Sequence, residues 1–522
     1  MRRRLTMLVV AAALLAVPAA PSATAADSDL CKQDLTAGSI LNVEVVCRIP
    51  TPRHEFDADG NVIRDPTTGL PVETQTQVTA INFLAYDADT GKRPRQPARD
   101  VLFAVGRFGL KSYDISDPTS PVLLDWLGDG IGDPPVPGGN EFGGLDGFWQ
   151  NEDMEVDPHR KLVILSRDPR AYDGTTQTGE SGVYIINALD PTNLRVLSYT
   201  TLPAGHTSTC INDCNWLWTG GPASSTQQQA IWPGGRPIIV TDIRDPARPR
   251  VYPDAIDLFR RDGVTAYSHD VQVDDQGIAW VSGSGGVRGY WTKGRQFDPL
   301  LGRARVATAW DPIPYAGGGI EDSAAPSRFM HNSVHPSGAD GADPSYGDLI
   351  YATEENFAFN CEEDGRFVIA SLEGSYDGQG WRSTPTEPFR LETIGTWQVD
   401  GQAGSSTVTD CSAHYFQLEN RIVAYSFYSQ GVRFLDISDP TNPIQVGYFR
   451  PDGGTSWAPY WHNGLLYTAD AHGIYVLRPT VYAGQLTQAV AAPALAAGPV
   501  VDPLARPGIE PAPGLFCAIR PD

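Results

Sequence analysis

The chain has 522 residues, with 62 acidic and 39 basic side chains and a formal net charge of −23. Such acidity keeps a protein soluble and repels polyanions, and no basic patch interrupts it, so nucleic acid is excluded as a partner. Beyond the N-terminal segment we expect no membrane span, because no apolar run approaches the length that a bilayer requires.

Residues 1–26 have the three parts of a secretory signal peptide. Arg2, Arg3 and Arg4 form a charged region, residues 8–17 form an apolar region, and residues 23–25 (ATA) offer small side chains for cleavage. The sequence therefore predicts a secreted, extracellular protein.

Residues 27–77 form an N-terminal segment before the main domain. Within it, residues 41–49 (LNVEVVCRI) alternate in polarity as a strand does. The last repeat unit of the chain lacks its outermost strand, so we expect this segment to supply that strand and close the ring.

A self-similar unit occupies residues 78–480. It is clearest at residues 431–443 (GVRFLDISDPTNP), where a glycine turn precedes an apolar strand and an Asp-Pro corner. Near-copies lie at residues 109–121, 182–194 and 237–249, and weaker ones at 286–291, 365–370 and 473–478. Each unit offers about four strands and no convincing helix, which predicts an all-β, seven-bladed β-propeller of four-stranded blades. A β-sandwich is the alternative, but seven copies of one unit argue against it.

The segments LDISDPTNP and YDISDPTSP resemble the LVIVD repeat of secreted bacterial β-propeller proteins. The resemblance covers most of residues 78–480, with four clear copies and three degenerate ones. It implies the propeller fold and an extracellular location. It implies little about activity, because one fold hosts many functions.

The chain ends in an Ala/Pro-rich tail, residues 481–522, which is typical of an extended linker. Seven cysteines in an oxidising compartment predict disulfides. Cys210 and Cys214 are four residues apart and can close a small loop, and we pair Cys361 with Cys411 because both fall on one propeller face. Cys31, Cys47 and Cys517 are an odd set, so a free or intermolecular thiol stays open.

Four of the nine histidines occupy one position in the repeat, where the innermost strand of a unit begins. They are His206, His269, His331 and His414, and Glu152 has the same position in the second unit. Innermost strands line the central channel of a propeller, so these five side chains are expected to converge at one mouth. Neutral imidazoles with a carboxylate suit copper, zinc or iron.

Loops between the second and third strands of the units reach the same face. They bring Asp470, His472, Glu354, Glu355, Arg107 and Arg167 toward this mouth. His54, His159, His335 and His462 are interpreted as ordinary surface or turn residues.

Two functions follow. In the first, the channel mouth binds a transition metal ion and supports redox or hydrolytic chemistry. In the second, the histidines only hydrogen-bond neighbouring backbone, and the protein is a non-catalytic extracellular scaffold for a protein or glycan. A serine hydrolase is disfavoured because the sequence has no G-x-S-x-G motif.

Overall fold

The structure is a computed structural model. It describes residues 30–31, 38–57, 59–88, 97–128, 152–169, 180–221, 238–254, 256, 268–283, 286–298, 301–320, 329–336, 342–343, 347–355, 365–372, 393–399 and 413–486. Residues 1–26, most of the C-terminal tail, Cys361, Cys411 and Cys517 lie outside these ranges.

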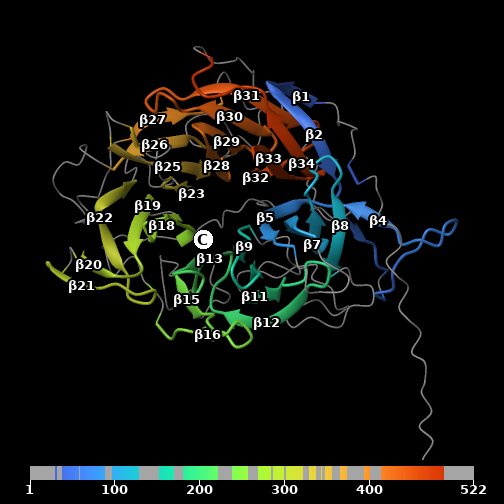
Figure 1. The fold of residues 1–522 in the computed structure, drawn as a ribbon, viewed down its shortest axis with the longest axis horizontal. Helices are drawn as coiled ribbons and strands as arrows, with labels where there is room; N and C mark the ends of the chain where they lie inside the picture. Colours follow the sequence, from blue (N-terminus) through green and yellow to red (C-terminus); the bar gives the residue numbers. More distant parts are fainter. Residues whose placement is uncertain are drawn as a thin grey trace, which may run out of the picture.

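Seven antiparallel sheets surround a central axis, so the chain is the expected all-β, seven-bladed propeller (Figure 1). We number the blades 1 to 7 in chain order and give their strands from the innermost outward. Blade 1 consists of β5 (Val78–Tyr86), β6 (Arg99–Gly106), β7 (Gly109–Asp114) and β8 (Val122–Leu127). Blade 2 consists of β9 (Glu155–Asp157), β10 (Leu162–Arg167), β11 (Ser181–Asn187) and β12 (Arg195–Leu202). Blade 3 consists of β13 (Thr207–Ile211), β14 (Trp216–Gly220), β15 (Ile239–Asp242) and β16 (Arg250–Val251).

The second half of the ring repeats the pattern. Blade 4 consists of β17 (Ser268–Val273), β18 (Ile278–Gly283), β19 (Gly286–Trp291) and β22 (Ile313–Ile320), and blade 5 of β23 (Phe329–Val334), β25 (Gly347–Glu355), β26 (Phe367–Ser371) and β27 (Thr393–Trp397). Blade 6 consists of β28 (Phe416–Glu419), β29 (Ile422–Ser426), β30 (Val432–Asp436) and β31 (Ile444–Pro451). Blade 7 consists of β32 (Ser456–His462), β33 (Leu465–Asp470), β34 (Gly473–Pro479) and β2 (Val43–Ile49). Additional short strands are β1 (Gly38–Leu41), which extends blade 6, β24 (Ala342–Asp343), which pairs with β25, and the hairpins β3 (Pro52–His54) with β4 (Glu73–Gln75) and β20 (Arg295–Asp298) with β21 (Arg303–Val306). Across these described segments there is no helix that could cross a membrane.

The core consists of seven apolar clusters, one between each pair of neighbouring blades. Strand β6 shows why its sequence is apolar without a break. Val101, Phe103 and Val105 face blade 2, whereas Leu102 and Ala104 face blade 7. Because successive strand residues point to opposite faces, a strand buried on both sides is apolar at every position.

The Asp-Pro corner of the repeat joins the third strand of a blade to the fourth. In blade 6 the Oδ1 atom of Asp439 accepts hydrogen bonds from the backbone N–H and hydroxyl of Thr441, at 3.0 and 2.6 Å. Asp117 with Thr119 repeats the arrangement at 2.9 and 2.7 Å. A short acidic side chain that bonds the backbone two residues on fixes the turn, so the motif is the strand-reversal signal of the blade.

The N-terminal segment supplies strands to two blades. Strand β2 pairs with β34 and is the outermost strand of blade 7, the strand that the last repeat unit lacks in the sequence. The expected single strand at residues 41–49 is wrong at its first residue, because Leu41 ends β1 on blade 6. Asn42 separates the two strands, with a positive φ of 57° and an Nδ2–H that donates to the Val446 carbonyl at 2.7 Å. The N-terminal segment thus connects blade 6 to blade 7.

Two disulfides lie in the described part of the chain. Cys210 bonds Cys214 beside the turn between β13 and β14, and Cys31 bonds Cys47 of strand β2. The second bond ties the N-terminal segment to the closing strand. Pairing of Cys361 with Cys411 stays a prediction.

Closure of the ring by β2 can be tested at Ile49. Its side chain is fully buried in the cluster between blades 7 and 1. Ile49→Ala should lower the free energy of unfolding by about 2–5 kcal/mol, because it leaves a cavity in that cluster. Guanidinium titration followed by tryptophan fluorescence would measure the change.

Glu44→Ala, on the exposed side of the same strand, is the matched control and should change stability by no more than about 0.5 kcal/mol. Equal effects of the two substitutions would show that β2 does not complete the ring.

Candidate metal centre

The structure brings the five expected residues together at one end of the central channel. Glu152 lies three residues before β9, and His206 directly precedes β13. His269 and His331 lie near the start of β17 and β23, and His414 lies two residues before β28. We call these five residues the ring. Each comes from a different blade, so only the closed propeller assembles them.

A β-bulge marks this position in several blades. The pairing register shifts between Ser268 and Asp270 in β17, and between Met330 and Ser333 in β23. The extra residue of a bulge is left out of the ladder and its side chain is re-aimed. In these two strands that residue is a ring histidine, or lies beside one, so the irregularity turns an imidazole toward the axis.

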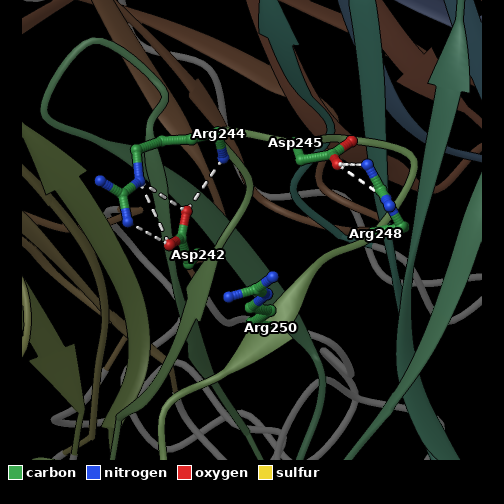
Figure 2. A pocket seen from close by; sticks show the side chains of 5 residues that line it. All are labelled: Asp242, Arg244, Asp245, Arg248 and Arg250. Atoms are coloured by element: carbon green, nitrogen blue, oxygen red, sulfur yellow. Dashed lines mark hydrogen bonds and ion pairs between the residues drawn. The ribbon is translucent and has the colours of Figure 1, made fainter.

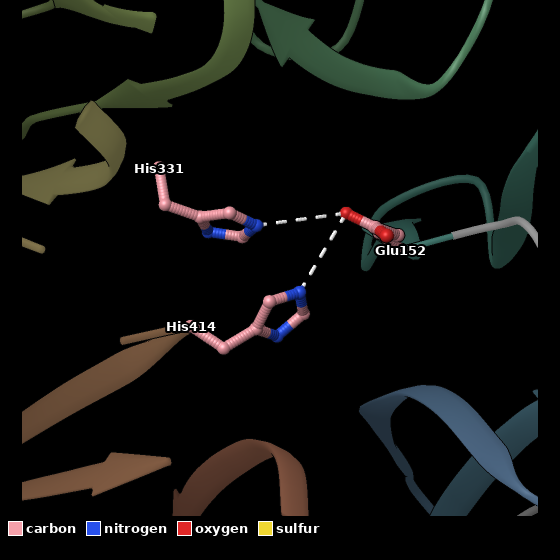
Figure 3. Close-up of side chains that lie close together, drawn as sticks. All are labelled: Glu152, His331 and His414. Atoms are coloured by element: carbon pink, nitrogen blue, oxygen red, sulfur yellow. Dashed lines mark ion pairs between the residues drawn. The ribbon is translucent and has the colours of Figure 1, made fainter. Parts of the chain in front are cut away.

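All four imidazoles face one carboxylate oxygen. The Nε2 atom of His206 lies 2.9 Å from Glu152 Oε2, and the same atom of His269, His331 and His414 lies at 3.6, 3.7 and 3.9 Å. Figure 3 shows His331 and His414 aimed at this oxygen from two blades. All five side chains are at most 1% exposed. The donor atoms form two triads that share Glu152, one with His206 and His269 and the other with His331 and His414.

The outer nitrogens of two ring histidines bind the backbone of the next blade. The Nδ1 atom of His269 lies 2.9 Å from the carbonyl oxygen of His331, and that of His414 contacts the carbonyl oxygen of Trp457. A carbonyl only accepts, so each Nδ1 must carry the proton. The Nε2 atom of a neutral imidazole then presents its lone pair to the centre of the ring.

His206 is held by a carboxylate instead. Its Nδ1 lies 2.8 Å from Asp168 Oδ2, and both side chains are fully buried. A carboxylate behind an imidazole orients the ring and raises its basicity, as in carboxylate–histidine–metal arrangements. Asp168 was not anticipated, although it directly follows β10, where loops were expected to reach this face.

The protonation states follow from burial and from the two carboxylates. Burial alone would lower the pKa of His206, but Glu152 and Asp168 together raise this pKa to about 9. Burial lowers the pKa of His269, holds that of His331 well below its ordinary value, and lowers that of His414 to about 4. Burial also opposes ionisation of Glu152, yet His206 and its neighbours hold the Glu152 pKa well below its usual range. The ring therefore contains one carboxylate, one imidazolium and three neutral imidazoles.

Of the four imidazoles that face Glu152, only the protonated one, His206, lies within hydrogen-bonding distance of the carboxylate oxygen. The lone pairs of His269 and His414 face the same anionic oxygen at 3.6 and 3.9 Å, too far for a hydrogen bond and unfavourable without a positive charge between them. Two ligands with bonds of about 2.0–2.2 Å to one ion lie roughly 3–4 Å apart. The four distances to Glu152 Oε2 match that spacing, so a cation fits in either triad of the ring.

Of the side chains that were expected to reach the ring from neighbouring loops, Glu354, Asp470 and His472 have other partners. Glu354 Oε1 accepts from Arg366 Nη2 at 2.6 Å, and Asp470 Oδ2 accepts from the Ser456 hydroxyl at 3.1 Å. His472 Nε2 lies 3.0 Å from the Asp452 carbonyl oxygen. These contacts hold the loops of that face.

Three histidines interpreted as surface or turn residues are instead wedged between an acid and an aromatic ring. His335 contacts Asp274 at 2.7 Å and the edge of Trp280. His462 lies between Asp100 and the ring of Phe83. His54 lies between Glu73 and the ring of Trp126. The turn interpretation was wrong for them because the inter-blade packing of these rings cannot be seen locally. His159 is exposed, as expected.

A separate hollow of about 320 Å³ lies beside β15 and β16 (Figure 2). Its charges are largely paired within the hollow, Arg244 with Asp242 at 2.6 Å and Arg248 with Asp245 at 2.8 Å. Surface pairs of this kind contribute little and leave little charge for a ligand. The ring is therefore the stronger candidate site.

Similar folds occur among solved structures. They include the extracellular domain of a one-component system, BT4673, from B. thetaiotaomicron (10% identity, TM-score 0.40, 81% of this chain and 40% of that chain). The WD40 β-propeller domain of Doa1 (8%, 0.39, 77% and 96%) and the periplasmic gluconolactonase PpgL of Pseudomonas aeruginosa (11%, 0.39, 74% and 87%) are also similar. The chain thus spans less than half of the first of these proteins. No protein-family model and no curated protein sequence matches the chain.

The raised pKa of His206 predicts a pH dependence of stability in the metal-free protein. The folded pKa of about 9 lies above the ordinary value of 6.5. The stabilisation from His206 is therefore fully present below about pH 6.5 and is lost as the pH rises through about 9. Denaturant titrations between pH 6 and 10 should show this fall in the free energy of unfolding.

Glu152→Gln is the comparison, because it removes the main carboxylate that raises this pKa. Its loss of stability over the same window should be smaller. Identical slopes for the two proteins would contradict the pairing of His206 with Glu152.

Proposed function

We propose that this chain is a secreted β-propeller of the LVIVD-repeat kind that binds a transition metal ion in the ring, between Glu152 and the four histidines. One observation carries the proposal. Four imidazole nitrogens from four blades lie within 3.9 Å of a single carboxylate oxygen, in a place closed to solvent. The signal-like residues 1–26 and the two disulfides support the extracellular location.

A purely structural network explains the ring less well. Burying an anion is costly unless its charge is compensated. The proton on His206 provides one compensating contact, but a histidine that served only to brace the backbone would need no position facing an anion. The Nδ1 contacts to the next blade instead leave Nε2 available at the centre, which is the arrangement that metal ligands have.

The donor set favours a first-row transition metal. Imidazole nitrogen with one carboxylate suits copper, zinc or iron, whereas calcium and magnesium prefer oxygen ligands alone. Each triad would hold such an ion with three protein ligands and leave coordination positions open, as in catalytic rather than structural sites. When bound, such an ion supplies a Lewis acid or a redox centre, so the finer proposal is redox or hydrolytic chemistry.

The residues around the ion have separable tasks. His269 and His414 would hold it with nitrogens fixed by the next blade, and Glu152 would neutralise part of its charge. Asp168 would orient His206 without touching the ion. Burial of all these side chains excludes bulk water and strengthens each interaction with the ion.

The alternative is a non-catalytic scaffold that binds a protein or glycan, and the sequence offers five tryptophans for such a surface: Trp149, Trp216, Trp218, Trp457 and Trp461. Trp149 lies outside the described residues. Trp218 and Trp457 are buried, at 1% and 7% exposure, so they are not part of a binding surface. Trp216 and Trp461 are half-buried. If the ring binds no metal, the scaffold function replaces the metal-binding one.

The double substitution His269→Ala/His414→Ala should abolish stoichiometric metal in the purified mature protein, because it removes one ligand from each triad. Elemental analysis after expression with copper, zinc and iron would measure the metal content. His159→Ala/His472→Ala is the matched control, since both histidines lie outside the ring, and it should retain the metal. Unchanged metal content in the ring variant would show that the histidines are structural.

Asp168→Asn tests the orienting carboxylate. The amide keeps the size of the side chain but loses the charge, so metal affinity should fall about 10–100-fold while the fold is retained. Competition with a chelator would measure the affinity. Glu180→Gln, at an exposed carboxylate near the same loop, should leave it unchanged. Equal affinities for Asp168→Asn and the unmodified protein would remove Asp168 from the site.

A further inference from the structure

A second cavity lies on the propeller axis, directly adjoining the ring. Its volume is about 420 Å³, within the range of small-molecule sites. Three of its lining residues, Asp153, Asn332 and Tyr415, immediately follow ring residues in sequence. The cavity therefore occupies the channel along the innermost strands, beyond the ring.

Its described lining is acidic, with no basic side chain. Asp153 and Glu155 line it, and Asp270 is fully buried close to Asp153. No lysine, arginine or histidine is among the described lining residues. Asp153 Oδ2 and Asp270 Oδ1 are buried without a hydrogen-bond partner in the described structure. Because a buried carboxylate without compensation is costly, burial and the neighbouring acidic groups raise the pKa of Asp153, and burial raises the pKa of Glu155 to about 7. A cation between these carboxyl groups would favour their ionised form, so the geometry of the cavity favours a positively charged ligand.

The amides that line the cavity are already engaged by the scaffold. Asn82 Nδ2 donates to the Met154 carbonyl at 2.6 Å, and Gln417 Oε1 accepts from the Trp461 backbone N–H at 2.7 Å. Asn332 Oδ1 accepts from the hydroxyl of Thr353 at 2.5 Å. A sugar needs many donors and acceptors, so these commitments argue against a neutral polyol.

Aromatic side chains supply the rest of the wall. Phe83, Tyr415, Phe416, Tyr460 and Trp461 all line the cavity. Aromatic faces attract cations, and they pack well against the apolar body of a ligand. Carboxylates combined with aromatic rings are the chemistry that recognises an organic ammonium group.

We propose that this cavity binds a small organic cation, with its ammonium group toward Asp153 and Glu155 and its apolar body against Phe83, Tyr460 and Trp461. The proposal does not depend on an ion in the ring, so either can fail while the other stands. An anionic ligand would be repelled by these acidic groups, and a neutral one would do nothing to favour their ionised form.

Calorimetric titration of the mature protein with phenethylamine, which is an ammonium ion at pH 7, tests the proposal. Saturable one-to-one binding is expected. The neutral 2-phenylethanol and the anionic 3-phenylpropionate have similar bodies and should bind at least ten-fold more weakly. Comparable binding of the alcohol and the amine, or no binding of the amine, would overturn the proposal without any variant.

Glu155→Gln locates the site. It removes one lining charge at nearly constant size and should weaken phenethylamine binding at least ten-fold. Asp275→Asn, at an exposed carboxylate in the turn after β17, removes the same charge away from the cavity and should leave the affinity unchanged. Thermal melting checks that both variants fold. Equal affinities of the two variants would place the amine elsewhere and overturn the site.

Discussion

The carboxylate of Glu152 faces four imidazoles in a place that water does not reach, and the centre of the molecule depends on how that charge is compensated. An isolated buried anion would be strongly unfavourable. The imidazolium of His206, itself backed by Asp168, compensates part of it. The remaining histidines present lone pairs rather than protons, which leaves the centre suited to a metal cation.

This arrangement depends on closure of the propeller. His414 is anchored to the carbonyl of Trp457, on the innermost strand of blade 7. Blade 7 is completed by β2 from the other end of the chain, and the Cys31–Cys47 disulfide ties that strand down. A repeat protein whose blades contact only their neighbours transmits such a constraint from blade to blade. The closure of the propeller and the geometry of the five-residue ring at its centre are therefore linked.

The channel axis holds two chemically different layers. The ring offers nitrogen donors around one carboxylate, and the adjoining cavity offers carboxylates among aromatic rings. Asp153 and Asn332 directly follow Glu152 and His331, so adjacent residues of the same segments serve both layers. A bulge at the start of β17 and β23 permits this, because it changes the direction of successive side chains.

The sequence by itself determined the blade pattern and the shared position of the five ring residues. Both are local and repeat with the unit, since Asp439 builds its corner with Thr441 two residues away, and His206 and His269 each lie at the start of an innermost strand. Only the tertiary structure decided that Leu41 joins blade 6, that Asp168 backs His206, and that His335 is wedged beside Trp280. These contacts join residues of different strands or blades, and their distances are set by how the blades pack around the axis. A repeat fixes which position a residue occupies, but the packing of blade against blade fixes what it touches.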